Sequence, residues 1–311
     1  MHLDTLVSGM LRNVIELLPR LRPKHIRVLK ILLRSLPRYQ YVPINVLAAK
    51  LKMKSSMARK ILQHLIDLGL VVAKEKDYEG YRLSQWGLDL LALRKLRNFV
   101  ELQSISHRID VGKEADIYVC YGADGSPYII KAYRLGRTSF KKVRSARPVY
   151  HVEAGSWFAM SIKAAKREFH VLSTLWGVGV AVPKPLIWAY HMILMDYVPG
   201  RELHKVRLRN PLSIFRNTIE EIIKAYYVGG IVHGDLSEYN ILVNEETGEI
   251  WIIDWPQWLP ADHPEASEYL RKDLEQIIKY FHRKYKLDFD VLWEIVETVS
   301  RKYLDQSREA S

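Results

Sequence analysis

The sequence predicts an α+β protein with two domains, and three observations support this fold class. The chain has 311 residues, more than a single hydrophobic core usually serves. Its first third contains three helical patterns followed by a pair of strand patterns, the order of a winged helix. The remainder begins with strand patterns and becomes helical, as in a small sheet lobe followed by a helical lobe. We therefore expect a first domain over residues 1–97 and a second over 98–311, with lobes at about 98–195 and 196–311.

The composition excludes several classes of protein. Apolar residues make up 48% of the chain and charged residues 26%, which excludes a disordered or collagen-like protein. No run of about 18 uncharged apolar residues is available to cross a bilayer, and we expect no membrane partner. The single cysteine, Cys120, excludes an internal disulfide and a multi-thiolate metal site. Together these features predict a cytoplasmic protein.

The net charge of +12 lies entirely in the first third of the chain. Residues 1–100 contain 19 Lys/Arg and 7 Asp/Glu, whereas the other 211 residues contain 28 of each sign. Such a block of positive charge favours a polyanionic partner such as nucleic acid. The alternative is a solvated basic face without a partner.

The helices of the winged helix are predicted from the spacing of apolar residues. Residues 24–36 repeat them at helical spacing and stop before Pro37, a helix terminator. A second helix follows over about 43–51, and a third begins at Lys54 and ends before Gly69. The third helix is predicted to bury one face, made of Met57, Ile61, Leu62, Leu65 and Ile66.

The wing is predicted as two strands, over 70–73 and 81–83, and a helix over 86–97 leads out of the domain. In a helix-turn-helix, the second helix of the pair presents its exposed side to nucleic acid. The donors that it would present here are led by Lys54, Arg59 and Lys60. The choice between DNA and RNA stays open, and docking of another protein is the alternative use of this module.

The second domain contains the most specific motif of the sequence, IVHGDLSEYNILV at residues 231–243. Strand patterns precede and follow it, at 115–121, 128–133, 187–196 and 250–253. Asn240 follows Asp235 by five residues, the spacing with which kinase-fold enzymes place a carboxylate beside the attacking group and an amide oxygen on the nucleotide's metal. Asp254 ends an apolar strand 14 residues later, where a second metal-binding carboxylate belongs. These three residues predict a phosphotransferase site.

Two upstream residues fit the same chemistry. Lys131 lies in an apolar strand, where a lysine is costly unless it is paired with an anion. Glu168, on an amphipathic helix, and the nucleotide phosphates would supply that anion. Each residue taken singly also suits an ordinary solvent-facing or locally paired role, but the order of all five predicts a common site.

A short glycine loop precedes Lys131 by 19 residues. Gly112 stands between two predicted strands, where backbone amides can approach phosphates, and Lys113 and Glu114 follow it. A β-turn is the simpler interpretation of this single glycine.

These motifs resemble those of the RIO family of atypical kinases, and the winged helix resembles that of its Rio-two branch. The resemblance covers nearly the whole chain and implies a bilobal protein-kinase-like fold. It implies that Lys131 binds phosphate and pairs with Glu168, that Asp235 is the catalytic aspartate, and that Asn240 and Asp254 bind the metal. It also implies a transient phosphoryl group on Asp254. The implied cofactors are ATP with Mg²⁺ or Mn²⁺.

Further positions follow from the same resemblance. Met195, Asp196 and Tyr197 correspond to the linker that binds adenine, and residues 135–151 to a flexible loop. Ala115 departs from relatives that carry Ser or Thr there, so the hydroxyl that contacts phosphate in those relatives has no counterpart in this chain. The HGD sequence at 233–235 replaces HRD, so activation by loop phosphorylation is not expected.

The resemblance implies an ATP- and Mg-dependent serine/threonine kinase or ATPase in maturation of the small ribosomal subunit. Its partners would be the precursor of that subunit, ribosomal RNA and ribosomal proteins. Two alternatives stay open: an aminoglycoside-type small-molecule phosphotransferase, which shares the HGD loop, and a nucleic-acid-binding regulator that only senses ATP.

Overall fold

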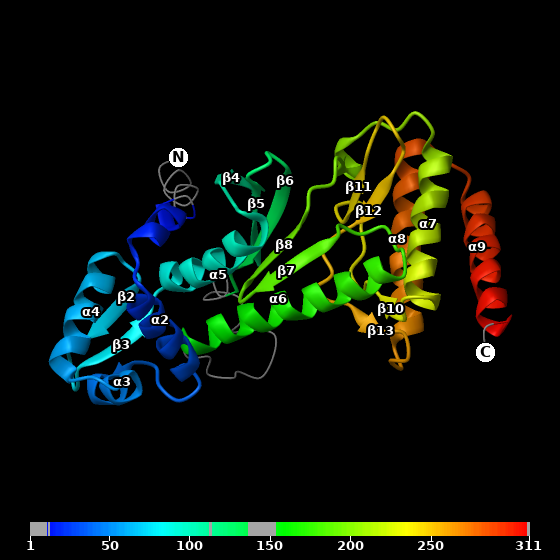
Figure 1. The fold of residues 1–311 in the computed structure, drawn as a ribbon. Helices are drawn as coiled ribbons and strands as arrows, with labels where there is room; N and C mark the ends of the chain where they lie inside the picture. Colours follow the sequence, from blue (N-terminus) through cyan, green and yellow to red (C-terminus); the bar gives the residue numbers. More distant parts are fainter. Residues whose placement is uncertain (1–10, 12, 112–113, 136–153, 310–311) are drawn as a thin grey trace. The chain divides into compact units, whose positions relative to one another are not determined.

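The computed structural model describes residue 11 and the ranges 13–111, 114–135 and 154–309 (Figure 1). The chain forms two compact units, one made of residues 1–166 and 186–195 and the other of 167–185 and 196–311. Helix α6 (Ala154–Gly177) begins in the first unit and ends in the second. None of the helices in these ranges is long and apolar enough to span a membrane.

The first unit begins with the predicted winged helix. Its helical elements are η1 (Leu18–Arg20), α2 (Pro23–Ser35), α3 (Ile44–Leu51) and α4 (Ser55–Asp67). Its sheet has the order β1-β3-β2, made of β1 (Val42–Pro43), β3 (Gly80–Leu83) and β2 (Val71–Lys74). Helix α2 starts with a proline, which suits the first helical position, and Gly69 follows α4 with a φ of 71° that favours glycine. The fold predicted for this domain is confirmed.

The prediction of a buried face on the third helix is wrong for one residue, Met57. Met57 is 57% exposed, whereas Ile61, Leu62 and Leu65 are buried and Ile66 is partly buried. Ala58 in the same turn is fully buried, so Ala58 rather than Met57 shares the buried face of α4 with Ile61, Leu62 and Leu65.

Helix α5 (Gln85–Val100) follows the wing, and the Ser84 hydroxyl caps it by accepting a hydrogen bond from the Gly87 N–H at 3.0 Å. The chain then enters a five-stranded sheet of order β4-β5-β6-β8-β7. Its strands are β4 (Ser104–Val111), β5 (Ala115–Tyr121), β6 (Pro127–Tyr133), β7 (Pro185–Ala189) and β8 (Met192–Asp196). Buried apolar side chains of α5 and of this sheet belong to one core that continues into the winged helix.

The second unit contains three long helices and short strands that support the motif at 231–243. The helices are α7 (Pro211–Tyr227), α8 (Ala266–Tyr285) and α9 (Phe289–Glu309), and η2 (Leu203–Lys205) is a short 3-10 turn. The strands are β9 (Arg201–Glu202), β10 (Ile231–Val232), β11 (Ile241–Val243), β12 (Ile250–Ile252) and β13 (Leu259–Pro260). Phe215 of α7 and Phe281 of α8 meet edge to face in the core, with ring centroids 5.3 Å apart.

Candidate active site

The predicted metal-binding pair lies at the open end of a β-hairpin. Strands β11 and β12 pair antiparallel, with Ile241 opposite Ile252. The Ile253 N–H donates to the Asn240 carbonyl at 2.8 Å, which extends the pairing by one step. Asn240 and Asp254 therefore leave the same end of the hairpin as neighbours, although 14 residues separate them in the chain. Antiparallel pairing is the physical reason for their approach.

The backbone of Asp254 has a φ of 65°, in the left-handed region that most residues avoid. Aspartate tolerates this region better than most residues, and strained backbone often occurs at functional sites. At Asn240, the Ser237 hydroxyl donates to the side-chain oxygen at 2.8 Å, which fixes the orientation of the amide.

Asp273 of α8 binds the backbone of the loop that carries Asp235 through two hydrogen bonds. One carboxylate oxygen of Asp273 accepts the Gly234 N–H at 2.9 Å, and the other accepts the Leu236 N–H at 2.9 Å. The two donors flank Asp235, so this clamp fixes its backbone. Asp273 is 4% exposed, and burial raises its pKa against the opposing effect of the two N–H groups.

His233 connects the loop of Asp235 with the strand end that carries Asp254. Its Nε2 lies 3.1 Å from the Ile253 carbonyl oxygen, and its ring packs on Trp255 with centroids 4.6 Å apart. Burial lowers the pKa of His233, so the ring is neutral at pH 7 and Nε2 donates this hydrogen bond.

Asp235 itself is exposed and has a partner that the sequence did not indicate. The side-chain amide of Gln257 donates to Asp235 Oδ2 at 3.1 Å. Gln257 follows Asp254 by three residues, so one short segment supplies both the predicted metal-binding carboxylate and the group that orients Asp235.

Glu168 lies on α6 and is 1% exposed. One of its carboxylate oxygens accepts the Trp255 N–H at 3.1 Å. Glu168 therefore contacts the residue that follows Asp254 and stabilises the strained turn there.

Lys131 lies on β6, opposite Ile117 of β5, and is 7% exposed. Its ammonium group lies 5.3 Å from the centroid of the Tyr133 ring. Lys131 and Glu168 belong to different units, and their pairing stays a prediction.

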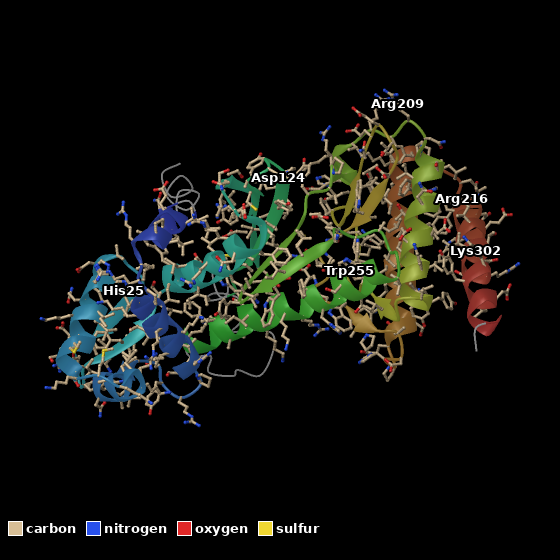
Figure 2. All side chains as sticks on the ribbon, in the orientation of Figure 1. His25, Asp124, Arg209, Arg216, Trp255 and Lys302 are labelled. Atoms are coloured by element: carbon tan, nitrogen blue, oxygen red, sulfur yellow. The ribbon has the colours of Figure 1, made fainter. Side chains whose placement is uncertain are left out.

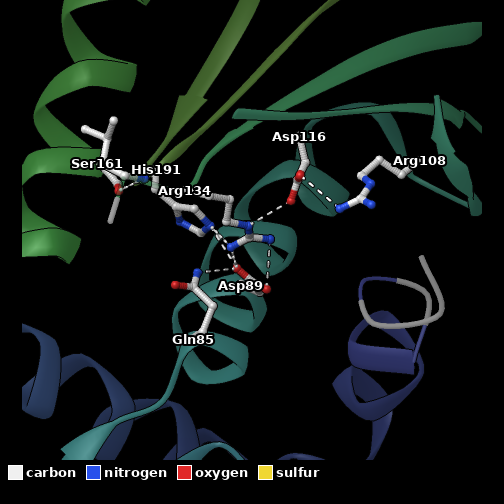
Figure 3. Close-up of polar contacts among 8 residues, drawn as sticks. Gln85, Asp89, Arg108, Asp116, Arg134, Ser161 and His191 are labelled. Atoms are coloured by element: carbon white, nitrogen blue, oxygen red, sulfur yellow. Dashed lines mark hydrogen bonds and ion pairs between the residues drawn. The ribbon is translucent and has the colours of Figure 1, made fainter. Parts of the chain in front are cut away.

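A buried ionic network fixes the end of the strand that carries Lys131 (Figure 3). Arg134, just after β6, donates from Nη2 to Asp89 of α5 at 3.1 Å and from Nε to Asp116 of β5 at 3.3 Å. Asp116 also accepts from Arg108 of β4 at 3.2 Å, and His191 Nε2 lies 2.8 Å from Asp89. Burial alone would raise the pKa of Asp89, but Arg134 and His191 outweigh it and hold the pKa well below its usual value. The network ties the last helix of the first domain to the Lys131 strand.

The predicted adenine-binding segment falls on both units. Met195 is buried in β8, and the Asp196 N–H donates to the Lys184 carbonyl at 2.9 Å. Tyr197 is 44% exposed. In the glycine loop, the Glu114 carbonyl accepts the Arg134 N–H at 2.7 Å.

Three predicted features lie outside the described residues: Gly112, Lys113 and, from position 136 on, the flexible loop at 135–151.

The chemistry of Asn240 and Asp254 fits Mg²⁺. This ion prefers oxygen ligands and is usually bound by one or two carboxylates together with substrate phosphates, rather than by a complete protein cage. Within the described ranges no three His, Cys, Asp or Glu side chains gather as a metal site.

Comparison with known proteins tests this assignment. A model of the RIO domain matches residues 116–292, and a model of the Rio2 N-terminal domain matches residues 18–98. The serine/threonine-protein kinase Rio2 of Methanocaldococcus jannaschii is 37% identical over 260 residues, which cover 80% of this chain and 93% of that protein. The Schizosaccharomyces pombe kinase rio2 is 35% identical over 257 residues, which cover 81% of this chain and 74% of that one.

Among solved structures, a complex of the Chaetomium thermophilum Rio2 kinase with ADP, Mg²⁺ and phosphoaspartate has a TM-score of 0.75. It is 26% identical, and the match covers 95% of this chain and 99% of that one. Fold and site thus define a kinase-like protein with a winged helix at its N-terminal side. More narrowly, the chain belongs to the RIO family of kinases, in its Rio2 branch. The resemblance in sequence is confirmed.

Proposed function

We propose that this chain is an ATP- and Mg²⁺-dependent serine/threonine kinase or ATPase. The observation that carries this proposal is the convergence of Asn240 and Asp254 on one hairpin end, with the loop of Asp235 bonded to the same strand end through His233. The ADP and Mg²⁺ of the Chaetomium Rio2 complex support it, because that protein shares the fold over most of this chain.

Each residue has a role in this proposal. Asn240 and Asp254 would bind the metal, which when bound offsets negative charge on the phosphates. Asp235, oriented by Gln257, accepts the proton of the attacking hydroxyl or water. Lys131 binds phosphate and pairs with Glu168.

Two further sets of residues complete the nucleotide site. Gly112, Lys113 and Glu114 approach the phosphates through their backbone. Met195, Asp196 and Tyr197 bind the adenine. Lys131 is 7% exposed, and a buried ammonium group is stable only beside anions, which Glu168 and the nucleotide phosphates would supply.

We infer that the reaction passes through a phosphoryl group on Asp254. A carboxylate oxygen of Asp254 would form a bond to the terminal phosphorus of ATP, and ADP would leave with the electrons of the broken bond. The strained backbone of Asp254 and the phosphoaspartate of the Chaetomium complex support this assignment.

We also propose a cellular setting: maturation of the small ribosomal subunit in the cytoplasm, through contacts with ribosomal RNA and ribosomal proteins. The winged helix would bind the nucleic acid through exposed basic side chains, for which the helix-turn-helix pattern of the sequence nominates Lys54, Arg59 and Lys60. The concentration of all net charge in the first 100 residues supports a polyanionic partner.

The enzyme is tested by ATP turnover and by transfer of labelled phosphate to the protein. Asp235→Ala and Asp254→Ala should each lower turnover at least ~100-fold, whereas Asp262→Ala, an exposed aspartate nearby, should leave it unchanged. Label that resists hydroxylamine would argue against an acyl phosphate. Phosphate transferred to an aminoglycoside instead would favour the small-molecule alternative, and full cellular function of Asp235→Ala would favour an ATP-sensing regulator.

A further inference from the structure

The winged helix contains a long stretch without acidic residues. Between Glu16 and Asp67 the chain has twelve Lys and Arg residues and no Asp or Glu. The net charge of this stretch, +12, equals that of the whole protein, and eight of its twelve basic residues lie on η1, α2, α3 and α4.

Helix α2 presents four of these charges on one face. They are spaced at i, i+3, i+6 and i+10, which places them on the side of the helix opposite its buried residues Ile26, Leu29 and Leu32. The four are Lys24, Arg27, Lys30 and Arg34, and all are exposed. At 1.5 Å per residue the row is about 15 Å long. We call these four residues the α2 basic row.

No carboxylate of the described ranges pairs with any member of the α2 basic row. The positive potential reaches His25 on the same helix, the labelled side chain at α2 in Figure 2. Burial lowers the pKa of His25 most, followed by the charge on His64 of α4, whose ring lies 4.9 Å away, and then by Lys24 of the row and Arg22 just before the helix. A surface of unpaired charge that already disfavours one more cation favours an anion.

At the predicted recognition helix α4 the arginine is paired, although the exposed Lys54 and Lys60 form no salt bridge within the part of the chain that the structure describes. The Arg59 guanidinium donates to Glu79 of the wing region through Nε at 2.9 Å and Nη2 at 2.8 Å, and the Tyr81 hydroxyl holds the same carboxylate at 2.6 Å. Gln63, also exposed on α4, donates to Asp67 at 2.9 Å. Two carboxylates, Asp67 at the end of α4 and Glu79 just before β3, therefore lie against exposed side chains of α4, and Glu79 pairs with the arginine that would contact phosphate.

From this contrast we infer that the α2 basic row is the main phosphate-binding surface of the winged helix, in place of the candidates Lys54, Arg59 and Lys60 at α4, and that its ligand is the backbone of a nucleic-acid duplex. This inference rests on the proposed binding of nucleic acid. A duplex carries one negative charge per about 1.7 Å of its axis, so a row about 15 Å long faces enough phosphates for all four side chains. Phosphate contacts fix the register and orientation of a protein on the duplex without reading its sequence. Binding through α2 therefore does not require a recognition helix inserted in a groove.

The test compares two full-length variants with equal net charge. One replaces the α2 basic row: Lys24→Gln, Arg27→Gln, Lys30→Gln and Arg34→Gln. The other removes four exposed lysines on or beside α3 and α4: Lys50→Gln, Lys52→Gln, Lys54→Gln and Lys60→Gln. Far-UV circular dichroism and melting temperatures establish that both fold. Binding to a 20-base-pair RNA duplex and to the DNA duplex of the same sequence is measured by fluorescence anisotropy between about 50 and 200 mM salt.

If all four residues of the row contact phosphate, the slope of log K against log salt falls by about 3.6 in the first variant. Over this fourfold range of salt, the wild type then loses about 150-fold more affinity than that variant. The second variant should change the slope by less than about 1. Binding to only one of the two duplexes, with the slope reduced mainly in the first variant, supports the inference and identifies the nucleic acid as RNA or DNA.

Two results would count against the inference, and they are distinguishable. An equal or larger loss of slope in the second variant would assign the phosphates to α3 and α4, and the nucleic-acid function would stand without the inference. A wild-type protein that binds neither duplex at 50 mM salt would remove the nucleic-acid function itself.

Discussion

The clamp beneath the Asp235 loop makes a quantitative prediction for Asp273→Asn. The carboxylate accepts two backbone N–H groups, one with each oxygen, and the side chain is 4% exposed. Asparagine keeps one acceptor but turns an NH₂ group toward the second N–H. One of the two hydrogen bonds is then lost, and its backbone N–H is left buried without an acceptor. The expected loss is about 3 kcal/mol of unfolding free energy.

The control is Asp288→Asn. Asp288 also accepts two backbone N–H groups, from Asp290 at 2.9 Å and Val291 at 3.2 Å, but it is exposed at the start of α9. Asparagine caps helices about as well as aspartate, so this variant should lose less than about 0.5 kcal/mol. Urea unfolding followed by tryptophan fluorescence measures both, and ATP turnover should fall at least ~10-fold only in Asp273→Asn. Equal stability and equal turnover in the two variants would refute the clamp.

The remaining predictions concern the ionic network, the pH dependence and the partner of Asp235. Arg134→Met leaves buried Asp89 without its arginine and removes one of the two arginines at buried Asp116, which should cost about 3 to 5 kcal/mol in urea unfolding. Arg301→Met, which breaks an exposed pair, should cost under about 1 kcal/mol. Burial lowers the folded-state pKa of His191 and of His233 below the unfolded value of 6.5, so the unfolded chain binds more protons and stability should fall as the pH drops below 6.5. Midpoints of urea unfolding at pH 7.5 and 5.5 check this, and a higher midpoint at the lower pH would contradict it. Gln257→Ala should lower kcat about 10-fold and leave the KM for ATP unchanged, because the amide orients Asp235; an effect confined to KM would contradict this role.

The elements and residues that follow from local spacing could be predicted from the sequence. Helix α2, the strand β5 and the motif at 231–243 lie where apolar periodicity and turn residues predict them. Asn240 and Asp254 could be paired because an apolar run begins directly after Asn240 and a predicted strand ends at Asp254. The register of β11 with β12 brings the two residues together.

Contacts between distant segments could not be predicted in this way. Asp273 lies 37 residues beyond Leu236, and nothing in the sequence of its helix indicates that it binds the Asp235 loop. Arg134 binds Asp89, which lies 45 residues earlier in the chain. In both cases a polar residue in the interior is satisfied only by the tertiary fold, which a local pattern does not contain. Met57 shows a limit of the helical period, which predicts a face but not its edge: the packing buries the small neighbour Ala58 and leaves Met57 exposed.

The central claim is that Asn240 and Asp254 form one metal site with a bound nucleotide, and binding of Mn²⁺ measured by electron paramagnetic resonance tests it most directly. In the presence of a non-hydrolysable ATP analogue, the wild type and Asp262→Asn should bind the ion with equal affinity, and Asn240→Ala and Asp254→Asn should each weaken it at least ~10-fold. Unchanged Mn²⁺ affinity in both site variants, with nucleotide bound, would contradict the account.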